Sequence, residues 1–242
     1  MALKCGIVGL PNVGKSTLFN ALTSAKALAA NYPFATKDPN VGMITVPDSR
    51  LDKLASLVNP QKVIPTTIEI LDIAGLIKGA SQGEGLGNQF LSNIREVDAI
   101  IHVVRCFDND NVVHVDGAVD PVSDKDVIDM ELLLKDIETA EKRVDKLRKA
   151  AKGADKAALQ QLAIGEKILN HLEGERPARE LELEDDEIDL FKEMMLLTAK
   201  PILYVCNVDE DSVTDGNEYT KKLEAAVANE DAEVIYISAE ME

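Results

Sequence analysis

The order of apolar and helical segments predicts an α/β fold, a mostly parallel sheet flanked by helices, with an inserted helical arm. Two observations carry this prediction: short apolar runs alternate with helical segments, and one long interval contains no strand candidate. Strands covered on both faces are continuous apolar runs, and their alternation with helices is typical of parallel sheets. The expected strands are residues 3–8, 41–46, 66–71, 98–104, 201–206 and 232–237, and residues 15–25 and 48–58 are expected helices.

The strand-free interval, residues 124–200, predicts the arm. An apolar seam of heptad type runs along its first half, and a second apolar series follows the turn signal AKGADK. We therefore expect two antiparallel helices joined near Gly153, then the acidic link ERPARELELEDDE and a shorter helix. One domain, residues 1–123 and 201–242, is interrupted by this arm. The seam residues are Met130, Leu133, Ile137, Ala140, Val144, Leu147 and Ala151, continued by Leu159, Leu162, Leu169 and Leu172.

Composition describes a chain with a sizeable core and a strong negative charge. The 242 residues are 45% hydrophobic and carry a net charge of -17. This charge argues against binding nucleic acid or anionic membrane over the whole surface, although a local basic patch stays possible in principle. No apolar run reaches the roughly 18 residues of a membrane helix, and the N-terminus does not resemble a signal peptide. We expect a soluble cytoplasmic protein without membrane contact, in which Cys5, Cys106 and Cys206 are buried thiols.

The segment GLPNVGKST contains the pattern G-x-x-x-x-G-K-[ST] from Gly9 to Ser16. It lies between an expected strand and an expected helix, which is the context that this phosphate-binding pattern requires. Its glycines would let backbone amides turn toward phosphate oxygens, Lys15 would bridge the β- and γ-phosphates, and Ser16 would bind Mg²⁺. A glycine-rich turn without a ligand is the alternative interpretation. The predicted nucleotide contacts in this loop are Asn12, Val13, Gly14, Lys15, Ser16 and Thr17.

Two further segments are candidates for sensing the γ-phosphate. DIAG, residues 72–75, ends an expected strand, which would place Asp72 at the Mg²⁺ ion and the Gly75 amide at the γ-phosphate. The polar segment NYPFATKDPNVG contains Thr36, a candidate for another Mg²⁺ ligand. Asp72 as a simple turn residue at the end of a strand is the alternative. Loops that a γ-phosphate orders and hydrolysis releases would form a switch.

These segments resemble a known family. GLPNVGKST, NYPFATKDPNVG and DIAGLIKGASQGEGLGNQFL resemble the Obg group of P-loop proteins, in the TRAFAC class of Ras-like NTPases. ANYPFATKDPNVG with GEGLGNQFLSNIREVDAI is similar specifically to the YchF (Obg-like ATPase) family, and the resemblance covers essentially the whole chain. It implies a coiled-coil arm before PILYVCN, a preference for ATP and association with ribosomes. The resemblance implies a helix and a small β-rich TGS domain after the ISA element; the sequence ends at Glu242, so either it is a fragment or it lacks this domain.

The expected base-reading loop departs from the guanine-specific pattern Asn-Lys-x-Asp. This chain has Asn207, Val208, Asp209 and Glu210 at those positions. Glu210 is one methylene longer than the Asp that binds guanine, and Val208 lacks the lysine stem that covers the ring. Asn207 can still pair with N7 of either purine. We therefore expect ATP to bind better than GTP, with Ser238 and Ala239 near the ring edge; a loop that reads either purine is the alternative.

The glutamine that orients the attacking water in Ras-like switches is replaced here by Leu76. An aliphatic side chain cannot orient water, so we expect slow intrinsic hydrolysis. His114, in CFDNDNVVHVDG, is the internal candidate for that role, which the resemblance supports, although a loop histidine without a role is the alternative. With Lys15 and Gly75 it forms the predicted catalytic set. His102 is expected to be a satisfied core residue and His171 a surface residue.

Two partner hypotheses remain. In related P-loop proteins that lack the glutamine, an asparagine at the position of Asn12 helps to hold K⁺, so K⁺ stimulation is expected beside Mg²⁺. The arm end, residues 141–156, holds seven Lys or Arg residues against three acidic ones. It is either a solvated helix face or a contact with ribosomal RNA. Three functions stay open for a chain expected to be monomeric: a slow ATPase switch on the ribosome, an Obg-type GTPase, and a nucleotide-gated binding module with incidental hydrolysis.

Overall fold

One six-stranded sheet forms the centre of the molecule. The computed structural model of the chain describes residues 2–27, 41–73, 86–109, 118–153 and 155–241. The strand order is β2-β3-β1-β4-β5-β6, and only the β2–β3 pair among these neighbours is antiparallel. Each predicted strand is present, with ends within one residue of the prediction. The strands are β1 Leu3–Val8, β2 Val41–Thr45, β3 Thr67–Asp72, β4 Ala99–Arg105, β5 Ile202–Asn207 and β6 Ala232–Ile237.

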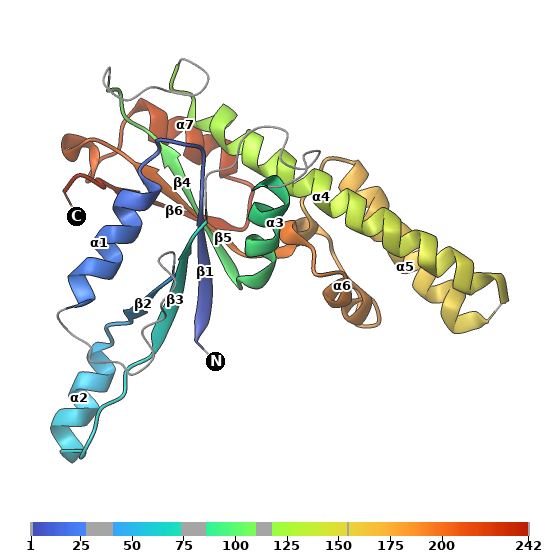
Figure 1. Cartoon of the computed structure of the whole chain (residues 1–242), viewed down its shortest axis with the longest axis horizontal. Helices are drawn as coiled ribbons and strands as arrows, with labels where there is room; N and C mark the ends of the chain where they lie inside the picture. The colour runs from blue at the N-terminus through green and yellow to red at the C-terminus, as the bar shows by residue number, and fades with distance from the viewer. Residues whose placement is uncertain (1, 28–40, 74–85, 110–117, 154, 242) are drawn as a thin grey trace.

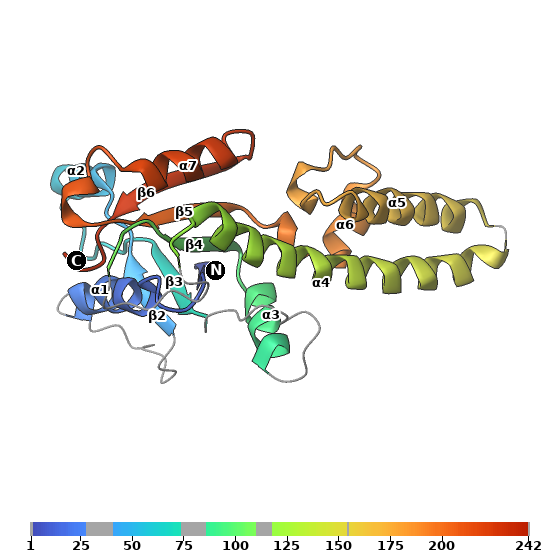
Figure 2. The same cartoon turned by 90° about the horizontal axis from the view of Figure 1, so that it is seen from above.

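Helices connect these strands, and a long helical pair extends away from the sheet (Figures 1 and 2). The predicted mostly parallel α/β fold with an inserted antiparallel arm is therefore confirmed. Short 3₁₀ segments are η1 Ala151–Gly153, η2 Ala178–Glu180, η3 Leu197–Ala199 and η4 Glu210–Ser212. The α-helices are α1 Lys15–Ala27, α2 Ser49–Val58, α3 Leu86–Glu96, α4 Pro121–Ala150, α5 Lys156–Glu173, α6 Ile188–Met194 and α7 Glu218–Val227.

Helix α4 belongs to two hydrophobic cores. It begins at an Asp120 cap, whose carboxylate accepts from the Val122 and Ser123 amides, and Pro121 occupies its first position. Near its start, Ile128 and Leu132 pack into the core of the sheet. Farther along, Leu133, Ala140 and Leu147 pack with residues of α5 and α6 in a separate arm core. One continuous helix of 30 residues therefore joins both parts, and the predicted division at 123/124 and 200/201 remains a prediction.

The arm seam differs from the predicted one in two places. Leu133, Ala140, Val144 and Leu147 are buried as expected, but Met130 is exposed because it lies at the arm base, where it lines a polar pocket. Leu159 is exposed as well. Ile164, Gly165 and Ile168 are buried on α5 instead, and this face is on the far side of the helix from Leu159. A Cβ on Gly165 would lie 2.9 Å from Leu147 Cδ1, so the helices approach closely here.

The other core expectations are mostly confirmed. Cys5, Cys106 and Cys206 are buried free thiols. His102 is a core residue, but its Nδ1 atom has no hydrogen-bond partner in the part of the chain that the structure describes, so it is not fully satisfied. The prediction for His171 was wrong, because this side chain is buried and its Nε2 lies 2.9 Å from the Pro177 carbonyl. No helix among the described residues combines the length and apolarity needed to cross a membrane.

Candidate nucleotide-binding site

The loop between β1 and α1 has a backbone that only particular residues can adopt. Gly9 has φ 151° and Gly14 has φ 101°. A Cβ on Gly9 would lie 2.4 Å from the Val103 carbonyl oxygen, and one on Gly14 would lie 2.3 Å from Asn207 Nδ2. Both glycines are therefore required by conformation and by close approach of neighbouring atoms. Asn12 also has positive φ, at 63°, a conformation that asparagine tolerates better than most residues.

Lys15 is buried at the start of α1 and forms no ion pair with a carboxylate of the described residues. Its Nζ donates to the Leu10 carbonyl at 2.6 Å. Burial lowers the pKa of Lys15 to about 8, against the opposing influence of the Asp72 carboxylate. A desolvated cation that lacks an ion-pair partner gains strongly from a nearby anion. This environment suits a phosphate-binding lysine.

Two of the predicted metal ligands lie together beside this lysine. Ser16 Oγ donates to Asp72 Oδ2 at 3.1 Å, because β1 and β3 run parallel and end at the same edge of the sheet. Both are hard oxygen donors, as Mg²⁺ prefers, and Mg²⁺ commonly takes one or two protein oxygens and completes its shell with phosphates and water. Among the described residues, no group of three or more His, Cys, Asp or Glu is placed so that it could hold a metal ion. Ser16 and Asp72 therefore fit a Mg²⁺ ion that arrives with phosphates.

Asn207 connects three loops at the same edge of the sheet. Its Nδ2 donates to the Val13 carbonyl at 2.9 Å, and its Oδ1 accepts from the Ala239 amide at 2.9 Å. The next residue, Val208, is buried, and its amide donates to the Ile237 carbonyl at 2.8 Å. Val208 therefore serves the core and has no stem to lay over a base. Ser238, like Ala239, is buried.

Glu210 is placed differently from Asn207. It is exposed at the start of η4, a turn that Asp209 caps by accepting from the Ser212 amide at 3.0 Å. Within the described ranges, no hydrogen bond fixes the Glu210 carboxylate. Its predicted contact with the base stays a prediction. Thr17 is exposed on the first turn of α1. The remaining predicted site residues, Thr36, Gly75 and His114, lie outside the described residues.

Arg105 is a buried residue of this edge that sequence reasoning missed. It ends β4, pairs in register with Asn207, and is almost fully buried. Its guanidinium donates to the Phe107 and Asn109 carbonyls at 3.1 and 3.2 Å and lies 4.7 Å from the Phe107 ring centroid. Arg105 therefore shapes the chain that leads toward residues 110–117. The signal in the sequence was a charged residue that ends an otherwise apolar run next to Cys106.

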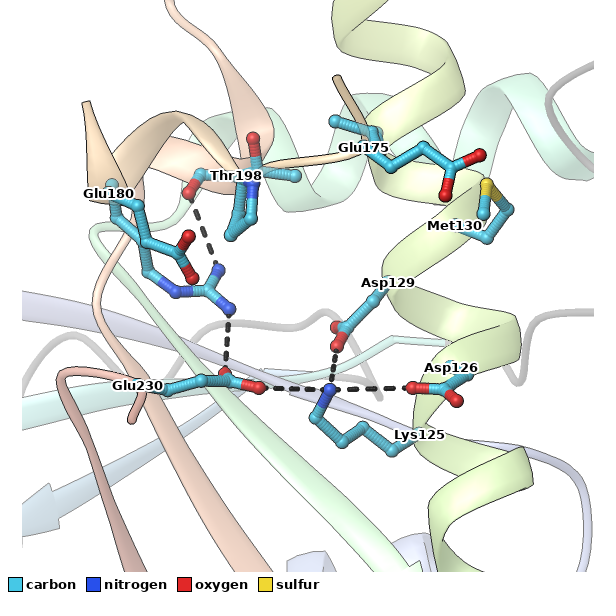
Figure 3. Close-up of a pocket in the computed structure, with 11 residues that line it drawn as sticks. Lys125, Asp126, Asp129, Met130, Glu175, Glu180, Thr198 and Glu230 are labelled. Atoms are coloured by element: carbon cyan, nitrogen blue, oxygen red, sulfur yellow. Dashed lines mark hydrogen bonds and ion pairs between the residues drawn. The ribbon is translucent and has the colours of Figure 1, made fainter. Parts of the chain in front are cut away.

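A second polar cluster lies where the arm meets the sheet domain (Figure 3). A pocket of about 410 Å³ opens there, and none of its lining residues belongs to the β1–α1 loop. Lys125 Nζ lies 2.8 Å from Asp129, 3.0 Å from Glu230 and 3.5 Å from Asp126. Arg179 also pairs with Glu230, at 3.0 Å. We interpret this cluster as a joint between α4 and the turn that follows α7, because its charges neutralise one another.

The geometry at the carboxyl edge of the sheet defines the class of the protein. A glycine-bounded loop between strand and helix, a buried lysine, the Ser16–Asp72 pair and the bridging Asn207 together define a nucleotide-binding domain of the P-loop NTPase class. The profile of a family described as "50S ribosome-binding GTPase" matches residues 4–144.

Full-length similarity identifies the family within this class. "Ribosome-binding ATPase YchF" of Bacillus subtilis is 57% identical over the whole chain, which spans 67% of that relative, and the Escherichia coli O157:H7 protein of that name is 52% identical over 66% of its length. The solved structure described as Schizosaccharomyces pombe YchF GTPase superposes with a TM-score of 0.86 at 42% identity, covering 99% of this chain and 66% of that one. The chain belongs to the YchF family.

Proposed function

We propose that this chain is the nucleotide-hydrolysing part of a Mg²⁺-dependent, ATP-preferring switch that associates with ribosomes. The names of its relatives support hydrolysis and ribosome binding but disagree about the purine, since the B. subtilis protein is called an ATPase and the S. pombe structure a GTPase. The observation that carries the ATP preference is the environment of the base-reading loop. Asn207 is held against the phosphate loop, whereas Val208 is buried and Glu210 is exposed.

The two hydrogen bonds of the Asn207 side chain leave one amide hydrogen that can donate to the base. One amide hydrogen is used by the Val13 carbonyl, and the oxygen accepts from the Ala239 amide. The second amide hydrogen can donate to purine N7, which adenine and guanine share. Guanine binds more tightly than adenine only where an oriented carboxylate accepts hydrogen bonds from its N1–H and 2-amino groups. Glu210, unfixed by any hydrogen bond in the described part of the chain, supplies no such orientation, so GTP loses its usual advantage.

Hydrolysis would use the charges already gathered at the sheet edge. Lys15 would exchange the Leu10 carbonyl for phosphate oxygens, and the new anion would raise its pKa and keep it charged. Ser16 and Asp72 would hold Mg²⁺, which neutralises phosphate charge when bound. Thr36, the Gly75 amide and His114 would complete the metal shell, the γ-phosphate contact and the orientation of water. Asn12 would hold a K⁺ ion beside the phosphates.

Calorimetric titration of the Mg²⁺-loaded protein with non-hydrolysable ATP and GTP analogues tests the proposal. We expect ATP to bind tighter by about tenfold or more, because the guanine contacts are missing. The double variant Val208→Lys with Glu210→Asp restores the guanine pattern and should shift the preference toward GTP. Asp211→Asn, in the same turn, is the matched control. GTP preference in the unaltered protein would favour the Obg-type GTPase instead.

The hydrolytic residues are tested by turnover. His114→Ala should lower kcat while leaving the affinity for the ATP analogue unchanged, because the histidine is assigned to the water and not to binding. Turnover should be faster in K⁺ than in Na⁺ buffer, and Asn12→Ala should abolish that difference. Equal rates in both salts would exclude the K⁺ site. A third possibility, a nucleotide-gated binding module, predicts ribosome association that is unaffected when hydrolysis is blocked.

The arm tip is the proposed contact with ribosomal RNA. Arg148 pairs with Glu166 at 2.8 Å, but Lys146, Lys149, Lys152 and Lys156 are exposed and unpaired among the described residues. Unpaired cations are available for phosphates and would give salt-sensitive binding. Lys146→Glu with Lys149→Glu should weaken ribosome pelleting by about tenfold or more. Lys192→Glu, exposed on α6, is the matched control, and no change in the tip variant would remove the arm from the interface.

A further inference from the structure

The segment between β2 and β3 exposes most of its apolar side chains. None of the residues from 49 to 66 is buried. This segment contains α2 and the extended stretch that returns to the sheet, and Figure 1 shows α2 beyond the sheet, on the side away from the arm. Its exposed large hydrophobic residues, with their exposed fractions, are Leu54 58%, Leu57 78%, Val58 69%, Val63 42% and Ile64 67%.

Helix α2 has capped ends, but Leu51 and Ala55 are only half-buried and none of its residues is fully buried. Asp48 caps its start by accepting from the Arg50 amide, and Asn59, at φ 47°, ends it with a bond to the Ala55 carbonyl. Isolated helices shorter than about 12 residues are marginal in water, and most helices in proteins are stabilised by packing an apolar face. Contiguous exposed apolar patches commonly mark interaction sites. A ten-residue helix that buries none of its residues is therefore a candidate for a docking surface.

The charges beside this face indicate the kind of partner. Helical spacing places Leu54, Leu57 and Val58 on one side of α2, Lys53 next to Leu57, and Asp52 on the opposite side. Arg50 is already held by Asp48, at 2.9 and 3.0 Å. Lys53 and Lys62 have no partner among the described residues. In a chain of net charge -17, Lys53 therefore adds a positive charge at the edge of this apolar face, and Lys62 adds another in the exposed stretch that follows α2.

We propose that the exposed segment formed by α2 and the stretch after it, with Leu54, Leu57, Val58 and Ile64 as apolar anchors and Lys53 and Lys62 as cations, docks an acidic amphipathic segment of another protein. The partner would place apolar side chains on the leucine face and carboxylates on the two lysines, the helix-on-surface mode of recognition. This inference goes beyond ATP hydrolysis and does not depend on the purine preference. Its position away from the arm would let the partner and the ribosome be bound together (Figure 1).

Other ligands fit these observations less well. RNA would engage the lysines but leave the leucine face uncovered, because phosphates offer no apolar surface. An anionic membrane is an extended plane and would meet the -17 charge of the whole molecule, whereas a protein segment meets only the local patch. A second copy of this chain would need an acidic apolar face of its own opposite α2.

Fluorescence anisotropy with a designed probe tests the surface. The probe is a labelled helical peptide of about 15 residues with leucine at spacings of three and four and glutamate elsewhere. A peptide with lysine in place of every glutamate is its control. We expect the acidic peptide to bind better than the basic one. Leu54→Ser with Leu57→Ser should weaken it by about tenfold or more, since two apolar anchors are lost.

A charge reversal makes the test specific. Lys53→Glu with Lys62→Glu should lose the acidic peptide and gain the basic one, which a folding defect cannot produce. Two matched controls should leave acidic-peptide binding unchanged: Leu159→Ser, an exposed leucine on α5, and Lys146→Glu with Lys149→Glu at the arm tip. ATP-analogue affinity should be unchanged in every variant.

Several results would overturn the proposal. If the arm-tip variant no longer binds the acidic peptide, the peptide binds to the arm and not to α2. If the acidic and basic peptides bind equally well, the lysines do not select the partner by charge. Binding of phosphatidylglycerol vesicles that Leu57→Ser abolishes would identify a membrane contact, and a concentration-dependent dimer that the same variant dissociates would identify a second copy. Protection of the corresponding helix from hydrogen exchange in the free, longer B. subtilis relative would identify an intramolecular occupant.

Discussion

Two lysines of similar burial behave oppositely in this molecule. Lys15, in the phosphate loop, contacts a backbone carbonyl, and burial lowers its pKa to about 8. Burial alone would also lower the pKa of Lys125, at the arm base, but the carboxylates of Asp129 and Glu230 outweigh it and raise that pKa above the ordinary lysine value. A buried cation that forms no ion pair among the described residues gains from an arriving anion. A buried cation that is already paired serves as a structural joint.

The surroundings of the two lysines explain this difference. Around Lys125, the joint is extended by Tyr204, whose hydroxyl donates to Glu230 Oε2 at 2.9 Å. It continues to Asp136, whose carboxylate accepts from the Leu197 amide at 2.7 Å and the Thr198 amide at 2.8 Å. Around Lys15, the hydrogen bond goes to a backbone carbonyl, and the nearby Asp72 carboxylate only partly offsets the effect of burial. The proposed phosphate-binding lysine, Lys15, and the structural lysine, Lys125, therefore lie at two separate places in the fold.

The largest effect is expected at the arm base. Lys125→Met leaves Asp129 and Glu230 without their principal cation and should lower the free energy of unfolding by about 3–5 kcal/mol. Urea denaturation followed by circular dichroism measures it. Lys192→Met, at an exposed lysine on α6, should change stability little. A small effect at Lys125 would mean that the joint is solvated and the comparison with Lys15 is false.

Lys15→Met should produce a different pattern. Turnover of ATP should fall by about 10²–10³-fold, because the charge that stabilises the transition state is lost. Stability of the nucleotide-free protein should stay the same or increase, because methionine fills the site without a buried charge. Steady-state kinetics and urea denaturation of the same preparation measure both quantities. A variant that loses stability and turnover together would show that Lys15 also supports the fold.

The pH dependence of stability separates the lysines further. Because the pKa of Lys15 falls from 10.5 to about 8 on folding, its charged form disfavours the folded state below pH 8. Between pH 8 and 10.5 the unfolded chain binds more protons, so stability contributed by this group rises with pH, by about 3 kcal/mol at most. We expect nucleotide-free wild type to gain stability relative to Lys15→Met over this window. Equal slopes for both proteins would contradict the lowered pKa.

The smallest effect is expected at Tyr204, behind the joint. Tyr204→Phe removes one hydrogen bond to Glu230, which retains Lys125 and Arg179, and should lower the free energy of unfolding by about 1 kcal/mol. Tyr236→Phe is the control, because that hydroxyl bonds Glu224 at an exposed site. A loss of several kcal/mol in Tyr204→Phe would mean that the tyrosine organises the cluster.

The sequence predicted the sheet edge more completely than it predicted the arm. At the sheet edge, short-range patterns placed the six strands within one residue. The structure brings together Val13, Gly14, Asn207 and Ala239, whose nucleotide contacts remain a prediction. The predicted pairing of Ser16 with Asp72 at one metal site agrees with their hydrogen bond. Such positions depend on strand order and on backbone conformations that few residues allow.

The arm was predicted less completely. Its hairpin followed from heptad spacing, but Met130 and Leu159 are exposed, and His171 is buried. Spacing identifies a helix face without identifying which neighbour covers it. The pairing of Lys125 with Glu230 joins the start of the inserted arm to the turn after α7, far away in the chain, and local patterns contain no information about such a contact.

By itself, the amino-acid sequence determined the order of strands and helices, the pattern G-x-x-x-x-G-K-S and the difference from the guanine-specific pattern Asn-Lys-x-Asp, because these depend on local conformation and chemistry. Only the tertiary structure decided which buried charges are paired. Among the described residues, it separated Lys15, which has no ion pair, from the paired Lys125, held Asn207 between two loops, and left no residue of α2 fully buried. Those properties follow from burial and distance between segments remote in the chain, which are set only when the sheet and the arm pack.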